Sequence, residues 1–385
     1  MSQLSWSQAR AAAHAAATPL PPDTVPLAEA LGGTLATSMR AAVPVPGFDL
    51  AAMDGYAVSG SGPWQVSRVV LAGHGDPGDL GAGEAVEVAT GAPVPRGTGA
   101  VLPYEDACRS DDQVRGAVQD GRHVRRTGDD VPIGAELLAA GSMVGPAALG
   151  LAASVGLDVL ALRQRPRVVA LLTGDEIVHS GRPGSGRVRD AIGPQLPGLL
   201  GWFGAELTLR LPVPDQPAGE LAAALAAAQG EVVLSCGATA SGPADHLHTA
   251  LAELGGRLVV DGVACRPGHP QSLAVLPDGR YVVGVPGNPY AALVAMYTLV
   301  QPLIGGLSGR PLRHLPRARL AGDLPQSAVD TRLVPTRWAG DTLVPTGRDR
   351  PGSLWGAAQA DVLAVVPPDW AGHPVEFIRL AGPGG

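Results

Sequence analysis

Three short apolar runs, each followed by a loop that contains glycine, constrain this fold more than any other feature of the chain. They cover residues 167–172, 231–235 and 281–285. Continuous apolar runs bounded by Gly and Pro are typical of strands buried in a parallel sheet. Helical patterning lies between them, at residues 196–203 and 220–229. Because parallel strands need crossover connections, this alternation predicts a doubly wound α/β domain.

The loops after these runs carry the polar residues that we expect to form a site. They are T-G-D-E at 173–176, C-G-A-T-A-S-G-P-A-D at 236–245 and P-G-N-P at 286–289. Ligands of doubly wound sheets bind where the strands end, at their carboxyl edge. All three loops occupy that kind of position, so the sequence predicts that the chemistry lies there.

Carboxylates on this edge indicate a magnesium site. Asp175 and Glu176 follow the first run, and Asp190 and Asp245 lie on later loops of the same edge. Mg²⁺ prefers oxygen ligands and shares them with phosphates. Several carboxylates that converge at one strand edge are therefore candidate ligands for this ion.

The same edge offers donors to an anion. Asn288 and the backbone N–H groups of a helix that begins at Tyr290 suit a phosphate, because helix N-termini bind anions. Arg187, Arg189 and Arg266 would add charge-assisted hydrogen bonds to phosphate oxygens. Together these residues favour a magnesium-assisted site for a phosphorylated, nucleotide-linked small molecule.

A second interpretation stays open for the same residues. Asp175 and Asp190 can be helix caps, and the arginines can be solvated. The sequence contains no G-x-x-x-x-G-K-[ST] phosphate loop and no G-x-S-x-G elbow. A P-loop nucleotide site and a Ser-His-Asp hydrolase are therefore not supported.

Composition and charge exclude other classes. The formal net charge of −7 argues against a general nucleic-acid binder, since such a surface repels phosphate backbones. Cys108, Cys236 and Cys265 are widely spaced and lack a C-x-x-C pattern, which favours free thiols in a reducing cytoplasm. No signal sequence is evident, and no apolar run reaches the roughly 20 residues of a membrane span. We expect a cytoplasmic protein.

The remaining segments predict smaller units around the α/β domain. Helices are expected at residues 5–17, 25–39 and 143–156, the first with a serine cap. Short β-rich runs separated by glycine turns fill residues 64–126, and a β-like composition returns after residue 308. These patterns predict an inserted all-β unit and a C-terminal β domain, joined by short hinges.

Four motifs resemble those of a known family. F-D-L-A-A-M-D-G-Y-A at 48–57 resembles the F-D-N-S-A-M-D-G-Y-A of the molybdopterin molybdenumtransferases, the MoeA family that includes the E domain of gephyrin. T-G-A-P-V-P at 90–95 resembles its T-G-A-P-x-P, and residues 173–176 and 286–289 match its T-G-D-E and P-G-N-P. The motifs occur in the family's order, and the resemblance extends to Gly352-Ser353.

The resemblance implies an elongated homodimer whose chain has four domains. They are a helical linker domain (1–44 and 136–162), an inserted β domain (45–135), a molybdopterin-binding α/β domain (163–308) and a C-terminal β-barrel domain (309–385). It also implies molybdenum cofactor biosynthesis: Mg²⁺-dependent insertion of molybdate into adenylylated molybdopterin, with release of AMP. The active site would lie between the α/β domain of one subunit and the inserted domain of the other.

Roles for individual residues also follow from the resemblance. The catalytic residues would be Asp54, Thr90, Glu105, Asp175 and Asp190, of which the first three reach across the dimer. The metal ligands would be Asp175, Glu176 and Asp245. The substrate-binding residues would be Thr173, Gly174, Glu176, Gly237, Ser241, Asp245, Arg266, His269, Pro286, Gly287, Asn288 and Pro289.

Four stretches depart from the family's motifs. Leu50-Ala51 replaces N-S, and Ala191-Ile192 replaces the S-N of D-S-N. Residues 237–242 replace G-G-V-S-x-G, and R-P-G-H-P at 266–270 replaces K-P-G-K-P. By resemblance, these last two loops help to hold molybdate. Arginine keeps a charge without the compact geometry of lysine, and histidine is cationic only part of the time near neutral pH.

These departures keep two further functions open. The chain can be a catalytically impaired relative that acts as a dimeric scaffold or adaptor for protein partners, for instance in cell division. It can also bind molybdopterin without turning it over. The intact T-G-D-E and M-D-G-Y-A motifs favour the enzyme, whose partner would be a molybdopterin adenylyltransferase.

Overall fold

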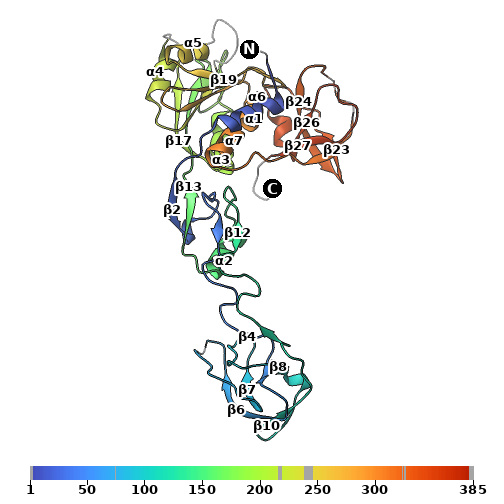
Figure 1. Ribbon diagram of the computed structural model, residues 1–385. Helices are drawn as coiled ribbons and strands as arrows, with labels where there is room; N and C mark the ends of the chain where they lie inside the picture. The colour runs from blue at the N-terminus through green and yellow to red at the C-terminus, as the bar shows by residue number, and fades with distance from the viewer. Residues whose placement is uncertain are drawn as a thin grey trace. The chain divides into compact units, whose positions relative to one another are not determined.

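The computed structural model describes residues 3–73, 75–215, 219–237, 246–322, 324 and 327–380. The chain forms two compact units (Figure 1). Unit 1 comprises residues 1–23, 32–36 and 162–385, and unit 2 comprises residues 24–31 and 37–161. Each unit has hydrophobic cores of its own.

Unit 1 is built around a six-stranded sheet with the order β17-β14-β18-β22-β21-β19. Its strands are β14 (Arg167–Thr173), β17 (Glu206–Val213), β18 (Val232–Cys236), β19 (Arg257–Asp261), β21 (Ser272–Val275) and β22 (Tyr281–Val285). The first four in the order run parallel, whereas β21 is antiparallel to β22 and to β19. The three strands predicted from the apolar runs, and their parallel pairing, are confirmed.

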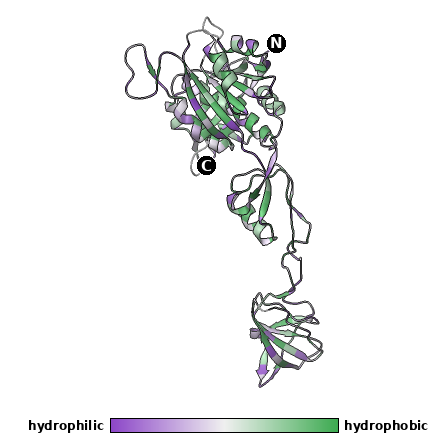
Figure 2. Ribbon diagram, turned by 90° about the vertical axis from the view of Figure 1, so that its left-hand side faces the viewer, coloured by the Kyte–Doolittle hydropathy of each residue, from purple (hydrophilic) through white to green (hydrophobic). Residues whose placement is uncertain are grey.

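Helices cover both faces of this sheet, and Figure 2 shows that its strands are largely hydrophobic. On one face Val168 of β14 shares a core with α3 (Leu196–Phe203). On the other face Val169 shares a core with α4 (Glu220–Ala227) and α5 (His246–Glu253). Because successive side chains of a strand point to opposite faces, a strand covered on both sides needs a continuous apolar run.

The longest helical segment, Pro289–Leu307, lies in the core of unit 1. It comprises α6 (Pro289–Ala295), a π-helical stretch (Met296–Val300) and α7 (Gln301–Leu307). With 19 residues and a mean hydropathy of 1.5 it is long and apolar enough to span a membrane by length and composition alone, close to the roughly 20 residues that the sequence was expected not to reach. However, 89% of its apolar window is buried inside the protein, as in the core helix of a globular domain.

The N-terminal helix α1 (Trp6–Ala16) packs against this long segment. Ser5 accepts a hydrogen bond from the backbone N–H of Gln8, and the Gln8 side chain accepts one from the backbone of Ser5, which completes a capping box. The Trp6 indole donates to the hydroxyl of Thr298 at 3.0 Å. The predicted helix with a serine cap is therefore confirmed.

The prediction of a helix at residues 25–39 is wrong. This stretch contains the end of β2 (Pro22–Pro26), a single 3₁₀ turn (Leu27–Glu29) and the start of β3 (Met39–Arg40). Pro26 has no N–H to give to a helix, and Gly32 adopts a φ of +75°, which breaks the helical path.

The C-terminal part of unit 1 is a closed β barrel. Its strands are β23 (Arg317–Leu320), β24 (Thr331–Ala339), β25 (Thr342–Pro345), β26 (Val362–Val366) and β27 (Val375–Arg379). The sheet order β24-β25-β23-β27-β26 returns to β24 through a β24–β26 pairing, which closes the ring. β1 (Leu4–Ser5) and β20 (Val263–Arg266) extend this sheet, and α8 (Trp355–Ala358) follows β25. The predicted C-terminal β structure is confirmed.

Unit 2 contains a six-stranded sheet with the order β8-β5-β7-β6-β10-β9. The strands are β5 (Gly55–Val58), β6 (Trp64–Val70), β7 (Glu84–Val88), β8 (Ala100–Pro103), β9 (Cys108–Ser110) and β10 (Gln113–Arg115). Shorter pieces are β4 (Leu50–Ala51), β11 (Val124–Arg125), β12 (Glu136–Leu138), β13 (Val159–Arg163) and α2 (Pro146–Ser154). The predicted β-rich character of this region and the helix near residues 143–156 are confirmed.

The position of β18 in the sheet predicts its share of stability. Leu234 of β18 is fully buried between two parallel neighbours, whereas Leu209 of the edge strand β17 is 45% exposed. Leu234→Ala should lower the free energy of unfolding by about 3 kcal/mol, because it leaves a cavity in a packed core. Leu209→Ala should lower it by less than about 1 kcal/mol. Urea unfolding followed by circular dichroism measures both, and equal losses would contradict this sheet order.

Candidate functional site

A cavity of about 790 Å³ lies at the carboxyl edge of the parallel strands. Loops that follow β14, β18 and β22 form its walls, as the sequence predicts. The lining includes Thr173, Gly174, Glu176, Arg189, Asp190, Asp215, Cys236, Gly237, Pro270, Pro286, Gly287, Asn288, Pro289 and Gly352. Ten of the predicted site residues, Arg189 among them, therefore share one cavity.

Short contacts tie the three loops together. The Thr173 hydroxyl donates to the backbone carbonyl of Cys236 at 3.1 Å. The Gly237 N–H donates to the carbonyl of Val285 at 2.9 Å. Gly237 adopts a φ of +106°, and a Cβ on it would lie 2.5 Å from the Thr173 hydroxyl oxygen. Only glycine fits this close approach.

Asp175 is held beside the cavity by reciprocal hydrogen bonds with Asp215. The Asp215 N–H donates to the Asp175 carboxylate at 3.2 Å, and the Asp175 N–H donates to the Asp215 carboxylate at 3.3 Å. Arg187 donates to the carbonyl of Asp175, so this guanidinium secures the loop. Glu176 and Asp215 line the cavity directly, whereas Asp175 does not.

Asp190 is a buried carboxylate in the cavity wall, with a side chain only 7% exposed. Its Oδ1 accepts hydrogen bonds from the N–H groups of Ile192 at 3.0 Å and Gly193 at 2.8 Å. Its Oδ2 lies 3.3 Å from Nδ1 of His179. Asp190 is therefore not the N-cap of a helix: its Oδ1 holds the turn before the 3₁₀ turn Gly193–Gln195, and the residue lies in the wall of the cavity.

The helix end after β22 differs from the expectation. Asn288 precedes α6 and lines the cavity, with no capping bond from its side chain. The Tyr290 N–H, expected to be available to an anion, instead donates to the carbonyl of Pro351 at 2.9 Å. Residue 289 is proline and has no N–H. The Tyr290 N–H is therefore not available to an anion, and Asn288 is the residue of this helix start that faces the cavity.

The predicted oxyanion loop is only partly at the cavity. Pro270 lines it, but Arg266 and His269 do not. Arg266 pairs with Asp330 at 2.8 Å, and this hydrogen bond raises the pKa of Arg266 further above its already high value. The imidazole of His269 contacts the side-chain amide of Gln3. Both side chains are thus engaged elsewhere in unit 1.

One thiol also faces this cavity. Cys236 ends β18 and belongs to the lining, yet its side chain is buried. Burial, with a smaller contribution from the charge of Asp190, raises the pKa of the Cys236 thiol to about 12. It therefore stays protonated at neutral pH and is a poor nucleophile.

Unit 2 brings together the predicted residues of the inserted domain. Oδ1 of Asp54 accepts hydrogen bonds from the backbone N–H of Thr90 at 2.6 Å and from its hydroxyl at 3.0 Å. Glu105 belongs to the 3₁₀ turn Tyr104–Asp106, whose first N–H donates to the carbonyl of Asp54 at 3.3 Å. Three predicted catalytic residues thus lie on one exposed surface of this unit.

Ser241 and Asp245 lie outside the described residues. Within the described ranges, no three His, Cys, Asp or Glu side chains converge as a metal-binding group. The sequence analysis did not predict Asp215 as a site residue.

Asp215 follows β17, which ends at Val213 on the same edge of the sheet, so the end of this strand was the available signal. The strand itself was not predicted, because its residues alternate and are mostly exposed.

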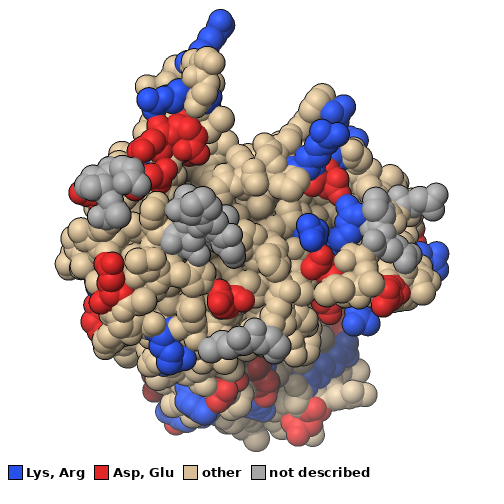
Figure 3. Space-filling model, turned by 90° about the horizontal axis from the view of Figure 1, so that it is seen from above, with Lys and Arg blue, Asp and Glu red and all other residues tan. Residues whose placement is uncertain are grey.

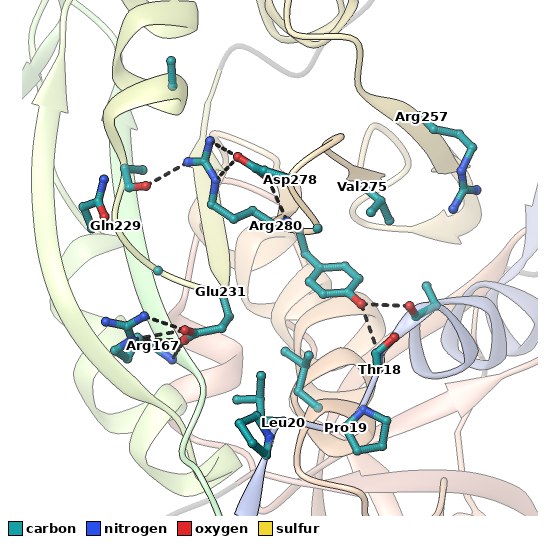
Figure 4. Close-up of a pocket in the computed structure, with 18 residues that line it drawn as sticks. Thr18, Pro19, Leu20, Arg167, Gln229, Glu231, Arg257, Val275, Asp278 and Arg280 are labelled. Carbon is teal, nitrogen blue, oxygen red and sulfur yellow. Dashed lines mark hydrogen bonds and ion pairs between the residues drawn. The ribbon is translucent and has the colours of Figure 1, made fainter.

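A second groove, of about 860 Å³, lies at the amino edge of the same strands (Figure 4). Its guanidiniums are largely neutralised: Arg167 pairs with Glu231 at 2.6 Å, and Arg280 pairs with Asp278 at 2.7 Å. The guanidinium of Arg257 has no ion pair with the other residues that line this groove (Figure 4). One unneutralised guanidinium is a weak basis for an anion site.

Charged groups on unit 1 are dispersed. Seen from above, the described acidic and basic side chains form small groups of both signs among uncharged surface (Figure 3). The face seen there therefore carries no broad field of one sign.

Comparison with known proteins agrees with this geometry. Residues 4–156 match the family described as MoeA N-terminal region (domain I and II), and residues 169–306 match a probable molybdopterin binding domain. Molybdopterin molybdenumtransferase 1 of Mycobacterium tuberculosis is 33% identical, over 95% of each chain. Molybdopterin molybdenumtransferase of Haemophilus influenzae is 33% identical, over 74% of this chain and 72% of its own.

A solved structure shows the same architecture. The molybdopterin biosynthesis MoeA protein of Pyrococcus horikoshii superposes with a TM-score of 0.83 at 28% identity, over 99% of this chain and 100% of its own. The chain therefore belongs to the molybdopterin molybdenumtransferase family, a family of transferase enzymes.

Proposed function

We propose that the protein acts in molybdenum cofactor biosynthesis, by Mg²⁺-dependent insertion of molybdate into adenylylated molybdopterin with release of AMP. One observation carries this proposal: the residues of three separate motifs line a single cavity at the carboxyl edge of the sheet. Doubly wound sheets bind their ligands at that edge. A volume of about 790 Å³ is in the range of small-molecule and cofactor sites.

The cavity offers groups for both reactants. Arg189 lies in the wall and suits an oxyanion, either molybdate or a phosphate of the substrate. Asp190 lies in the same wall and would accept the proton of the water that attacks the phosphoanhydride, and the two N–H groups on its Oδ1 fix its orientation. In this proposal, cleavage of the P–O–P bond gives AMP and a molybdopterin phosphate, with the oxygen supplied by that water.

The donor set fits Mg²⁺. Glu176 and Asp215 line the cavity and Asp175 lies beside them, so the available donors are all oxygens. Magnesium is commonly held by one or two carboxylates together with substrate phosphates and water, so a group of three is not required. Glu176 and Asp175 would hold the ion, which would supply positive charge against the phosphoanhydride oxygens. Asp245 would be a further ligand.

We also propose a homodimer in which Asp54, Thr90 and Glu105 complete the site of the other subunit, and a cytoplasmic location. This arrangement follows the four-domain division at residues 1–44 with 136–162, 45–135, 163–308 and 309–385. The exposure of all three residues on unit 2 supports it, because they are open to a partner.

A specific observation favours the second candidate, a catalytically impaired scaffold. Arg266 and His269, which occupy the family's oxyanion loop, contact Asp330 and Gln3 instead of lining the cavity. A reconstitution assay separates the two functions. Purified protein is mixed with adenylylated molybdopterin, Mg²⁺ and molybdate. Molybdate-dependent AMP release and activation of a cofactor-free molybdoenzyme support the enzyme, and binding without either product supports the scaffold.

The close approach of two loops predicts a strong effect of one methyl group. Gly237→Ala places a Cβ 2.5 Å from the Thr173 hydroxyl oxygen and 2.9 Å from its carbonyl oxygen, so the loops must separate. A shift of about 1 Å in a site typically costs on the order of 100-fold in rate. AMP release should therefore fall by at least about tenfold.

Gly279→Ala is the matched control, since Gly279 also has a positive φ, +89°, but nothing lies within 4 Å of its Cβ. Both variants place alanine at a positive φ and so strain the backbone, but only Gly237→Ala brings its Cβ into a steric clash with Thr173. Equal activity of the two variants would show that the contact between the Thr173 and Gly237 loops is not needed.

The proposed magnesium ligands predict an altered metal requirement. Glu176→Gln removes a charge from the cavity wall and should raise the Mg²⁺ concentration for half-maximal AMP release by about tenfold. The exposed Asp341→Asn in the barrel should leave this concentration unchanged. Titration with Mg²⁺ at fixed substrate measures both, and an unchanged midpoint for Glu176→Gln would remove Glu176 from the metal site.

A further inference from the structure

Beside Asp54 on unit 2 stands an exposed aromatic ring that none of the motifs includes. Tyr104 is 45% exposed, although aromatic side chains are usually mostly buried. Its backbone N–H donates to the carbonyl of Asp54 at 3.3 Å, so the ring and the Asp54–Thr90 pair belong to one surface. An exposed ring next to candidate catalytic groups is available to contact a ligand.

The ring is rigidly held. The Tyr104 hydroxyl donates to Oε1 of Glu87 at 2.7 Å. Arg109 donates to the other oxygen of Glu87 at 2.9 Å, which fixes that carboxylate in turn. The Tyr104 ring also packs edge-to-face on Tyr56, with centroids 5.3 Å apart and planes at 85°. Rigid aromatic rings provide contact area at a low cost in conformational entropy.

The hydroxyl remains a donor at all physiological pH values. Burial, together with the hydrogen bond to Glu87 and the charge of Glu87, holds the pKa of the Tyr104 phenol well above its ordinary value. The phenol therefore stays protonated, and the bond to Glu87 persists. The ring is thus held by contacts within unit 2 alone, which is the preorganisation expected of a binding surface.

The groups around the ring select the chemistry of a ligand. Glu87 and Asp106 pair with Arg109 at 2.9 Å and Arg122 at 3.4 Å, whereas the carboxylates of Asp54 and Glu105, next to Tyr104, have no ion pair among the described residues. Carboxylates repel phosphates and accept hydrogen bonds from N–H groups. An aromatic face stacks on planar heterocycles whatever their substituents. The surface therefore suits the nitrogen-rich ring of a ligand rather than its phosphate end.

We propose that Tyr104 is a stacking platform for the planar nitrogen heterocycle of the substrate, with Asp54 and its neighbours facing the ring's N–H groups. The inference rests on the proposed function, since it takes the substrate to be a pterin joined to a nucleotide. It adds a specificity residue that the sequence motifs do not contain. Tyr104 binds substrate and takes no part in bond cleavage.

The test compares substitutions of one ring in the reconstitution assay. Base–aromatic stacking contributes about 1–3 kcal/mol, so Tyr104→Leu should raise the KM for adenylylated molybdopterin by about 10-fold and leave kcat within about twofold. Tyr104→Phe keeps the ring and should raise KM by less than about threefold. Free pterin is a second probe: its fluorescence should be quenched on binding to the wild type and not to Tyr104→Leu.

Trp338→Leu is the matched control. Trp338 is 41% exposed and packs edge-to-face on Phe377 with centroids 5.3 Å apart, the same geometry on the barrel of unit 1. It should change neither KM nor pterin quenching. Three results would each overturn the stacking role. They are an unchanged KM for Tyr104→Leu, a KM for Tyr104→Phe raised as much as that for Tyr104→Leu, and a fall in kcat with no change in KM. Absence of turnover in the wild type would instead count against the proposed function, while pterin quenching still tests Tyr104.

Discussion

The approach of the loop after β14 to the loop after β18 is the contact on which the cavity depends. The hydroxyl of Thr173 reaches the carbonyl of Cys236, and Gly237 leaves no room for a side chain between the two loops. The N–H of Gly237 then binds the carbonyl of Val285, which brings in the third loop. Because each of these bonds is accepted by a backbone carbonyl at the end of a buried strand, the rigidity of the sheet passes directly to the walls of the cavity.

The sheet could be predicted because its signal is local. Apolar runs as short as Val232–Leu234 need burial on both faces, and parallel neighbours with helices above and below provide it. β17 escaped notice because Leu207, Leu209 and Leu211 alternate with polar residues, as in an edge strand, and do not form the continuous apolar run by which the other strands were found. The false helix at 25–39 shows that composition without a cap or a clear period is a weak signal.

The location of the candidate site could be predicted from the sequence, but the side chains that face the cavity could be predicted only in part. Motif residues from three loops do share one cavity, because strands of a parallel sheet end at a common edge. Which side chains face the cavity depends on contacts that sequence does not reveal. Arg187 secures the Asp175 loop, and Pro351 takes the N–H of Tyr290. Tyr104 belongs to none of the motifs, and only its exposure beside Asp54 in the structure identifies it as a candidate binding residue.

The departures from the family motifs are of two kinds: at some positions the residue makes its contact through the backbone, and at others through its side chain. Ile192 packs in the core of unit 1 while its N–H holds Asp190, so loss of a polar side chain there leaves that carboxylate in place. Ala51 is likewise buried and pairs through its backbone with Ala92. Arg266 differs, because its side chain itself is engaged, by Asp330. Substitutions at backbone-held positions preserve the geometry of a site, whereas those that redirect a side chain change what the site can bind. Of these departures, the one at Arg266 is therefore the one whose side chain is drawn into a contact away from the cavity.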